Sequence, residues 1–253
     1  MIITFLGTGT SQGVPVIACD CEVCTSTDKH DNRLRTSILI ESTDKTIVVD
    51  SGPDFRYQML RAKVKHLDAI VFTHEHKDHV AGMDDIRAFN FKQHGPVEVY
   101  ADARVQLALR REFPYIFVDK GYPGIPQINL HNIDLTPFDI GSVHFIPIEV
   151  MHYKLPVLGF RINDFTYITD AKTVSDAEKE KIRGSKILVI NALQKEMHIS
   201  HLTLNEAIAF AQDINAERTY FTHISHRLGK HADIMKELPP GIELAYDGLM
   251  LEI

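Results

Sequence analysis

The stretch T-H-E-H-K-D-H at residues 73–79 directly follows an apolar run at residues 69–72. Three histidines and an aspartate fall within residues 74–79, and both side-chain types are common ligands of transition metals. A short buried strand that ends in an H-x-H pair can direct both imidazoles to one side. One such pair is a weak signal, because surface histidines also pair by chance, and a solvated polar loop is the alternative interpretation. The full run H-x-H-x-D-H predicts a metal site with room for a second ion.

The composition is that of an ordinary globular protein. The chain has 253 residues, of which 44% are hydrophobic, enough for a substantial core. No linker or repeat divides it, so we expect a single domain over residues 1–253. The formal net charge of -7 gives no overall electrostatic reason to bind nucleic acid, although a local basic patch stays compatible with this charge. The sequence shows no signal peptide and no apolar run as long as a membrane span, so we expect a cytoplasmic protein.

The cysteines form one tight group. The chain has three of them: Cys19, Cys21 and Cys24. An odd count in one cluster argues against a disulfide framework and for a metal, and thiolates with an imidazole suit a closed tetrahedral zinc site. We therefore expect a zinc-binding loop at residues 16–33, with reduced surface thiols as the alternative. His226 is our choice for the fourth ligand because it lies three residues after His223, and His30 is the second choice because it is nearer in sequence.

Apolar runs and turn residues predict an alternation of strands and helices through the whole chain. The predicted strands are residues 2–6, 36–41, 45–50, 68–72, 97–101, 143–151, 157–162, 165–169, 186–190, 218–222, 242–246 and 249–252, with one more at the start of 133–152. The predicted helices are residues 54–62, 79–92, 102–113, 175–183, 203–214 and 231–237, and residues 114–127 form a loop near the site entrance or an edge. The helices must cover sheet faces, so this α+β pattern favours a helix–sheet–sheet–helix arrangement.

Three local signals refine these elements. Ser175 with Glu178, and Thr203 with Glu206, are typical of capping boxes at helix starts. Residues 52–54 are expected to cap the first helix, and the last two strands are expected to form a hairpin about Asp247.

The run at residues 74–79 resembles the signature of the metallo-β-lactamase fold superfamily. This resemblance implies a four-layer αββα sandwich with two metal ions at the edge of the sheets. His152, Asp170 and His223 each directly follow a predicted apolar strand, where the family pattern requires a ligand. By similarity, the ligand sets are His74, His76 and His152 for one ion, Asp78, His79 and His223 for the other, and Asp170 as the bridge between them. Each late residue alone has an ordinary structural explanation, but their order matches the family.

Asp50, in the run V-V-D-S-G at residues 48–52, matches a further feature of the superfamily. There it is expected to orient a metal-binding histidine through a hydrogen bond. A helix-capping or turn aspartate is the alternative interpretation.

Several stretches together resemble the PhnP type of phosphodiesterase, which opens a ribosyl cyclic phosphate in the carbon–phosphorus lyase pathway. They are G-T-G-T-S-Q-G-V-P at residues 7–15, C-x-C-x-x-C at 19–24, T-H-I-S-H at 222–226 and A-Y-D-G at 245–248. The resemblance implies a structural zinc at the cysteines and manganese or zinc at the catalytic pair. The PQQ-biosynthesis B proteins share a related cysteine cluster, so this cluster does not fix the substrate.

The expected reaction is hydrolysis of a small-molecule phosphodiester. Two ions lower the pKa of a bridging water, and the hydroxide attacks phosphorus in line with the leaving group. Asp170 is expected to help orient the hydroxide. His201 is the better match to the family's additional active-site histidine, as general acid or phosphate contact, and His198 is the weaker candidate. A solvated loop histidine is the alternative interpretation of His201.

Three other functions use the same fold. A tRNA 3′-processing nuclease carries a long inserted arm, whereas the loop at residues 114–127 is short and not basic. An acyl hydrolase acting on a thioester or lactone would have identical metals. A non-catalytic PQQ-B-like protein is disfavoured by seven intact ligand positions. The sequence leaves the substrate, the metal identity and a homodimer open.

Overall fold

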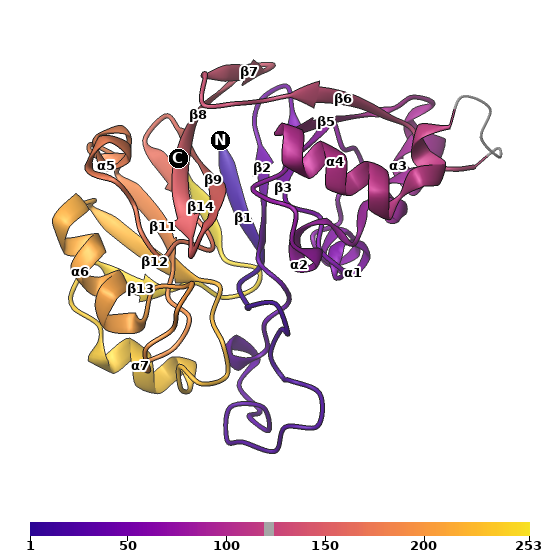
Figure 1. Cartoon of the computed structure of the whole chain (residues 1–253). Coiled ribbons are helices and arrows are strands. Elements are labelled where there is room, and N and C mark those ends of the chain that lie inside the picture. Colours follow the sequence, from indigo (N-terminus) through magenta and orange to yellow (C-terminus); the bar gives the residue numbers. More distant parts are fainter. Residues whose placement is uncertain (119–123) are drawn as a thin grey trace.

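Two seven-stranded sheets pack face to face, and helices cover both outer surfaces (Figure 1). This computed structural model describes residues 1–118 and 124–253. The expected α+β class and four-layer αββα sandwich are therefore confirmed. The two termini lie side by side, because the terminal amine of Met1 donates a hydrogen bond to the carbonyl oxygen of Ile253 at 3.0 Å.

Each half of the chain contributes most of one sheet. Across the first sheet the strands are β14 (Met250–Glu252), β1 (Ile2–Gly7), β2 (Ser37–Glu41), β3 (Thr46–Val49), β4 (Ala69–Val71), β5 (Val97–Ala101) and β6 (Ile128–Asn132). Across the second they are β13 (Ile242–Leu244), β12 (Arg218–Thr222), β11 (Ile187–Asn191), β10 (Phe165–Tyr167), β9 (Leu155–Ile162), β8 (Val143–His152) and β7 (Phe138–Ile140). Strands β3 to β6 run parallel, as do β10 to β13, so the loops after them emerge at shared strand ends.

The helices divide between the two outer faces. The first half contains α1 (Phe55–Arg61), α2 (Lys77–Val80), α3 (Arg87–Gln93) and α4 (Ala103–Glu112), and the second contains α5 (Asp176–Ile182), α6 (Leu204–Ile214) and α7 (His231–Glu237). Short 3-10 turns occupy Lys29–Asp31, Met83–Ile86 and Pro114–Phe117. Within the described residues, none of these helices has the length and hydrophobicity needed to cross a bilayer.

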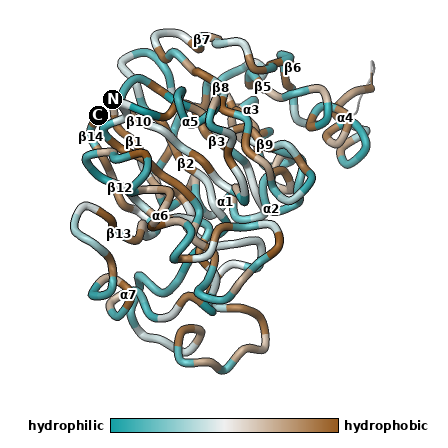
Figure 2. Tube along the Cα trace, turned by 60° about the vertical axis from the view of Figure 1, so that its left-hand side comes forward, coloured by the Kyte–Doolittle hydropathy of each residue, from teal (hydrophilic) through white to brown (hydrophobic). Residues whose placement is uncertain are grey.

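Three apolar cores hold the four layers together. Successive residues of a strand point to opposite faces, so a strand between two layers is apolar on both sides. In β2, Ile38 and Ile40 face the other sheet, whereas Leu39 faces the helices of the first half. Hydrophobic stretches are accordingly frequent along the strands (Figure 2). Burial of each such side chain contributes about 1.5–3 kcal/mol relative to exposure, so the alternation stabilises both interfaces of the sheet.

The predicted helix at residues 79–92 is wrong as a single element. The chain there forms α2, the 3-10 turn Met83–Ile86 and α3. The interruption follows Gly82, whose backbone N–H donates to the carbonyl oxygen of Ser51 at 2.8 Å. A Cβ at Gly82 would lie 2.2 Å from the carbonyl oxygen of Gly52. This close backbone approach bends the segment around the neighbouring loop.

The predicted hairpin at the C-terminus is also wrong. Strand β13 pairs with β12 in the second sheet, whereas β14 pairs with β1 in the first. The carboxylate of Asp247 accepts hydrogen bonds from Thr8 Oγ1 at 2.8 Å and from the backbone N–H of Leu34 at 2.9 Å, and pairs with Arg61 at 3.2 Å. Asp247 therefore lies in a turn, as expected, but this turn leads from one sheet to the other and its carboxylate is anchored to the first half of the chain.

Three smaller predictions also need correction. Strand β6 was missed; its N-terminal residue Ile128 pairs with Val97 of β5. The capping box at Thr203 is present, but at α5 the carboxylate of Glu178 instead accepts from the backbone N–H of Glu149 on β8 at 2.9 Å. Asp54 makes no side-chain cap on α1. Part of the predicted loop at residues 114–127, namely 119–123, lies outside the described residues.

We predict that Gly52→Ala destabilises the fold by about 1–3 kcal/mol or more, because a Cβ there would lie 2.0 Å from the carbonyl oxygen of Asp78. Urea unfolding measures the effect. The matched control is Gly95→Ala, where the added Cβ meets nothing within 4 Å. Equal unfolding midpoints for the two variants would contradict the prediction.

Candidate metal centre

The predicted ligands of the binuclear site gather at strand ends from both sheets. His74 and His76 lie in the loop after β4, Asp78 and His79 on α2, His152 at the end of β8, Asp170 after β10 and His223 after β12. Ligand atoms lie within 4.8 Å of one another in three overlapping groups: His74, His76 and Asp170; Asp78, His79, Asp170 and His223; His152, Asp170 and His201. Asp170 is common to all three groups, which is the position expected of a bridging carboxylate.

Asp170 presents both carboxylate oxygens to the surrounding imidazoles. Its Oδ1 lies 3.3 Å from Nε2 of His223 and 3.4 Å from Nε2 of His79. Its Oδ2 lies 3.8 Å from Nε2 of His74. The Thr169 hydroxyl also donates to Oδ1 at 2.5 Å, and the side chain is only 2% exposed, so polar groups of the protein surround the carboxylate.

His152 departs in part from its predicted ligand set. Its ring centroid lies 5.1 Å from that of His76 and 6.1 Å from that of His74. Its tightest grouping is with Asp170 and His201. The structure thus brings His152 to the cluster but does not by itself divide the ligands into the two predicted sets.

Several buried nitrogens at this cluster have no hydrogen-bond partner within the described part of the chain. They are Nε2 of His74, Nε2 of His79 and both ring nitrogens of His223. A buried polar atom without a partner costs about 1–3 kcal/mol, so such groups normally find one. Imidazole nitrogens around carboxylates are a suitable donor set for zinc, manganese or iron. The residues present therefore fit divalent metal ions.

Asp50 fixes the orientation of two of these histidines. Its carboxylate accepts hydrogen bonds from the backbone N–H of Thr73 at 2.9 Å and from the Thr73 hydroxyl at 2.8 Å, and lies 2.7 Å from Nδ1 of His79. Because the Thr73 hydroxyl donates to Asp50, it accepts from Nδ1–H of His74, 3.0 Å away. In both histidines Nε2 then faces Asp170, at 3.8 Å from His74 and 3.4 Å from His79. Nδ1 of His152 similarly donates to the carbonyl oxygen of Ser200 at 2.9 Å.

The buried charges at the cluster shift one another strongly. Burial lowers the pKa of His79, but Asp78, Asp170 and Asp50 outweigh it and raise that pKa well above its ordinary value. Burial and the neighbouring His79 hold the pKa of His74 well below the ordinary value. Burial raises the pKa of Asp170, but the surrounding histidines outweigh it and lower it well below the usual range. The ionised carboxylates create a negative potential that a cation can compensate.

Left-handed backbone conformations concentrate at this cluster. The φ angles are 64° at Asp50, 57° at Asp170 and 54° at His223, and Tyr153, directly after His152, has 57°. Such conformations cost of order 1–3 kcal/mol in non-glycine residues and persist where the surroundings impose them. They turn the chain sharply at the strand ends and so aim the side chains at one point.

His201 lies at the cluster, and His198 lies farther out. The ring centroid of His201 is 4.5 Å from that of His152 and 4.7 Å from that of His223, and its Nδ1 has no partner within the described residues. Burial, together with the charge of nearby histidines, lowers the pKa of His201 to about 2, so its free side chain is neutral. His198 is 5.1 Å from His201 and less buried.

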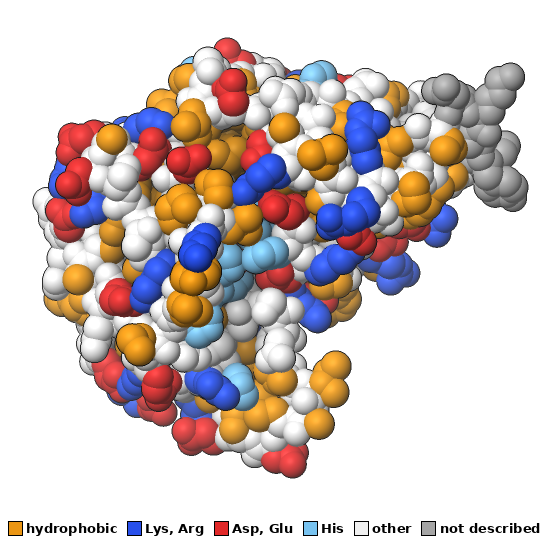
Figure 3. Space-filling view, viewed as in Figure 1, with side chains coloured by type: hydrophobic (Ala, Val, Ile, Leu, Met, Phe, Trp, Pro, Cys, Tyr) orange, Lys and Arg blue, Asp and Glu red, His pale blue; other side chains and the backbone are white. Residues whose placement is uncertain are grey.

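One face of the molecule displays this histidine cluster. Histidine side chains gather near the centre of the view, and both basic and acidic side chains lie around them (Figure 3). The cluster is therefore reachable from solvent on this face.

Comparison with known proteins places the chain in a family. Residues 45–224 match the family described as "Beta-lactamase superfamily domain", a span that contains all seven predicted ligands of the binuclear site. A solved structure of a diphosphatase from the PhnP family is 40% identical, with a TM-score of 0.93, over 100% of this chain and 97% of that one. The chain belongs to the beta-lactamase superfamily and to its PhnP family. The expected family is thus confirmed.

Two further similar proteins show that membership of the PhnP family does not by itself define the reaction. A protein of Porphyromonas gingivalis named octanoyltransferase is 40% identical over 247 residues, which is 96% of this chain and 50% of that protein. The chain thus spans about half the length of this curated relative. The zinc-bound PqqB of Methylobacterium extorquens is 19% identical, with a TM-score of 0.80, over 100% of both chains, and shows the fold alone.

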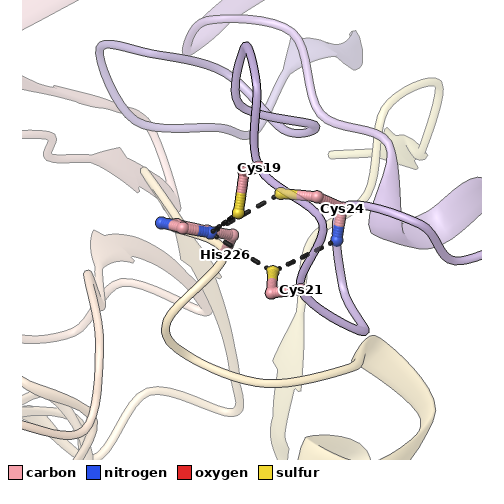
Figure 4. Close-up of side chains that lie close together, drawn as sticks. All are labelled: Cys19, Cys21, Cys24 and His226. Atoms are coloured by element: carbon pink, nitrogen blue, oxygen red, sulfur yellow. Dashed lines mark hydrogen bonds between the residues drawn. The ribbon is translucent and has the colours of Figure 1, made fainter.

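The cysteine cluster of this PhnP-family chain lies against His226. Nδ1 of His226 is 3.3 Å from Sγ of Cys19, 3.4 Å from that of Cys21 and 3.5 Å from that of Cys24 (Figure 4). A tetrahedral zinc, with Zn–S of about 2.3 Å and Zn–N of about 2.0 Å, separates such atoms by about 3.5 Å. The backbone N–H of Cys24, more than the nearby side chains, lowers the pKa of Cys21 to about 6, which favours a thiolate. The four side chains fit a zinc ion.

His30, the second choice for the fourth ligand, is elsewhere. Its ring centroid lies 4.4 Å from that of Tyr246 and 4.8 Å from that of His231. The structure thus groups His226 and not His30 with the cysteines.

We predict that His226→Ala loses one zinc per chain and keeps the other metals, because only the cysteine site loses a ligand. Elemental analysis of the purified variant measures this. The matched control, His30→Ala, should keep the full metal content, since His30 packs against aromatic rings away from the thiols. A zinc loss that followed His30 would refute the assignment.

We also predict that Asp50→Asn weakens binding at the binuclear site about 10- to 100-fold, because an amide in place of the carboxylate no longer holds both Thr73 and His79. Competition with a chelator of known affinity measures the change. Asp176→Asn, at a side chain 99% exposed, is the control that should leave affinity unchanged. Parallel loss in both variants would contradict this role for Asp50.

Proposed function

We propose that this protein is a metal-dependent phosphodiesterase that hydrolyses a small cyclic or nucleotide-like phosphodiester. The observation that carries the proposal is the position of Asp170, whose carboxylate is shared by all three groups of potential ligands. One carboxylate shared between two sets of ligands is an arrangement that suits a two-metal site. The likeness to a PhnP-family diphosphatase supports phosphorus as the centre that is attacked.

The proposed ligands are those of the family pattern. One ion is assigned to His74, His76 and His152, the other to Asp78, His79 and His223, with Asp170 shared by both. Two divalent ions, manganese or zinc, supply Lewis-acid polarisation of the phosphate and a water of lowered pKa when they are bound. The proposed structural zinc belongs to the separate cysteine site in the loop at residues 16–33.

His201 is the proposed contact to the phosphate or to the leaving group. It is buried beside His152 and His223, and its Nδ1 is free of partners within the described residues. A neutral imidazole donates a hydrogen bond from one ring nitrogen, so His201 can stabilise charge on a phosphate oxygen. A donor in this position also serves a departing alkoxide.

Lys154 is a proposed second contact for the substrate. It follows His152 and Tyr153 in the turn between β8 and β9, and its Nζ lies 5.3 Å from the centroid of the Tyr153 ring. Within the described residues Lys154 forms no salt bridge. An anionic group bound at the cluster can therefore recruit its charge.

An acyl hydrolase is the second candidate function. The name octanoyltransferase, given to the Porphyromonas gingivalis relative, points to acyl chemistry, although this chain matches only 50% of that protein. The metals and ligands of such an enzyme would be the same, so a substrate comparison is needed to decide between the two reactions.

We predict that the protein loaded with manganese or zinc hydrolyses phosphodiesters faster than acyl compounds. The assay compares bis-p-nitrophenyl phosphate, 2′,3′-cyclic nucleotides, a dinucleoside diphosphate, a thioester and a lactone, with a metal-stripped sample as control. Turnover confined to the thioester or the lactone would reject the phosphodiesterase and favour the acyl hydrolase. Cleavage of the diphosphate alone would narrow the reaction to phosphoanhydrides.

We predict that His201→Ala lowers turnover on the best phosphodiester by about 10²-fold or more, as expected for the loss of a hydrogen-bond donor to the phosphate or the leaving group. Its metal content should not change. His198→Ala is the matched control and should have a smaller effect, because His198 is more exposed than His201. Full activity of the His201 variant would remove this residue from the reaction.

A further inference from the structure

A separate cavity of about 360 Å³ lies between α1 and α3, and none of the residues that line it belongs to either candidate metal site. Its apolar wall consists of Phe55, Met59, Leu60, Val64, Ala88 and Phe89. The rings of Phe55 and Phe89 pack edge to face with centroids 6.4 Å apart and form part of the apolar core beneath the helices. Leu60 is 60% exposed, so the core here continues to a surface that solvent reaches.

Positive charge surrounds this apolar wall. The charged residues that line the cavity are Arg56, Lys65, Lys92 and Asp85, three cations and one anion. Within residues 1–118 and 124–253, none of the three cations forms a salt bridge. Such an excess is notable in a chain of formal net charge -7. Unpaired cations at the mouth of an apolar cavity are complementary to an anion with an apolar tail.

We propose that this cavity binds a medium-chain carboxylate, with the chain against Phe55, Met59 and Phe89 and the carboxylate near Lys65 and Lys92. The volume is at the lower end of small-molecule sites, which favours a single unbranched chain over a bulkier ligand. The methylenes gain by leaving water, and the head group stays at the charged mouth where it keeps part of its hydration. This binding site goes beyond the proposed phosphodiesterase activity and does not depend on it.

The test is calorimetric titration of the metal-loaded protein with butanoate, hexanoate, octanoate, decanoate and dodecanoate. Each added methylene should tighten binding about fourfold, equivalent to about 0.8 kcal/mol, until the cavity is full. Octanol should bind more weakly than octanoate, because it lacks the charge. Absence of saturable octanoate binding, or equal affinity for all chain lengths, would overturn the proposal.

Variants locate the site. Ala88→Phe, at an exposed position of α3 that lines the cavity, should fill it and abolish octanoate binding without changing metal content. The double variant Lys65→Met with Lys92→Met should weaken binding about fivefold, as expected for two exposed ion pairs. The charge-matched control is Lys63→Met, since Lys63 is exposed and does not line the cavity.

A second copy of the chain is the competing occupant of this surface. Sedimentation of the wild type and of Ala88→Phe tests it. The wild type could form a dimer that dissociates in Ala88→Phe, while this variant still binds octanoate. That outcome would overturn the carboxylate site and indicate a self-association surface instead. A sedimentation coefficient that Ala88→Phe leaves unchanged, with octanoate binding lost, supports the carboxylate.

Discussion

The hydrogen bonds to the buried carboxylate of Asp50 are the constraint on which the rest of the centre depends. A carboxylate removed from water costs several kcal/mol unless its oxygens are paired. Thr73 donates two hydrogen bonds to this carboxylate, and Nδ1 of His79 lies within hydrogen-bond distance of it. The loop after β4 must therefore close over Asp50. The same closure turns Nε2 of His74 and of His79 toward Asp170. The cost of burying one charge is thus offset by the contacts that orient two candidate ligands.

The sandwich brings the remaining ligands to this point. Parallel strands on both sides of the central core end together, and left-handed residues at Asp170 and His223 turn the chain there. The second half of the chain therefore contributes single candidate ligands at separate strand ends. The first half contributes the dense cluster of candidate ligands after β4. Packing in the central core keeps the two halves in register, since Ile38 and Ile40 of one sheet lie in the same cluster as Phe160 of the other.

Local sequence patterns predicted the layers of the fold and indicated the candidate site residues. Structural details that depend on contacts between distant residues were missed. His152, Asp170 and His223 lie at or just after the ends of apolar strands, so their places were readable from neighbours in sequence. The break at Gly82 depends on Ser51, and the role of Asp247 depends on Thr8, contacts that no local window contains. Strand β6 is rich in polar residues because it lies at the sheet edge, and only its pairing with β5 defines it. His226 was preferred over His30 from its place three residues after His223, and the assembled loops group it with the cysteines.

The cysteine site also couples the folding stability of the two halves of the chain. Cys19 and His226 are separated by 207 positions, so their four-ligand set exists only after both ends of the chain have folded together. A metal ion held there would bind the native state more tightly than the unfolded chain, which keeps the three thiols together but not His226 beside them. By mass action, free zinc then stabilises the whole fold in proportion to the logarithm of its concentration. The availability of that metal would thereby help to determine how much native protein is present.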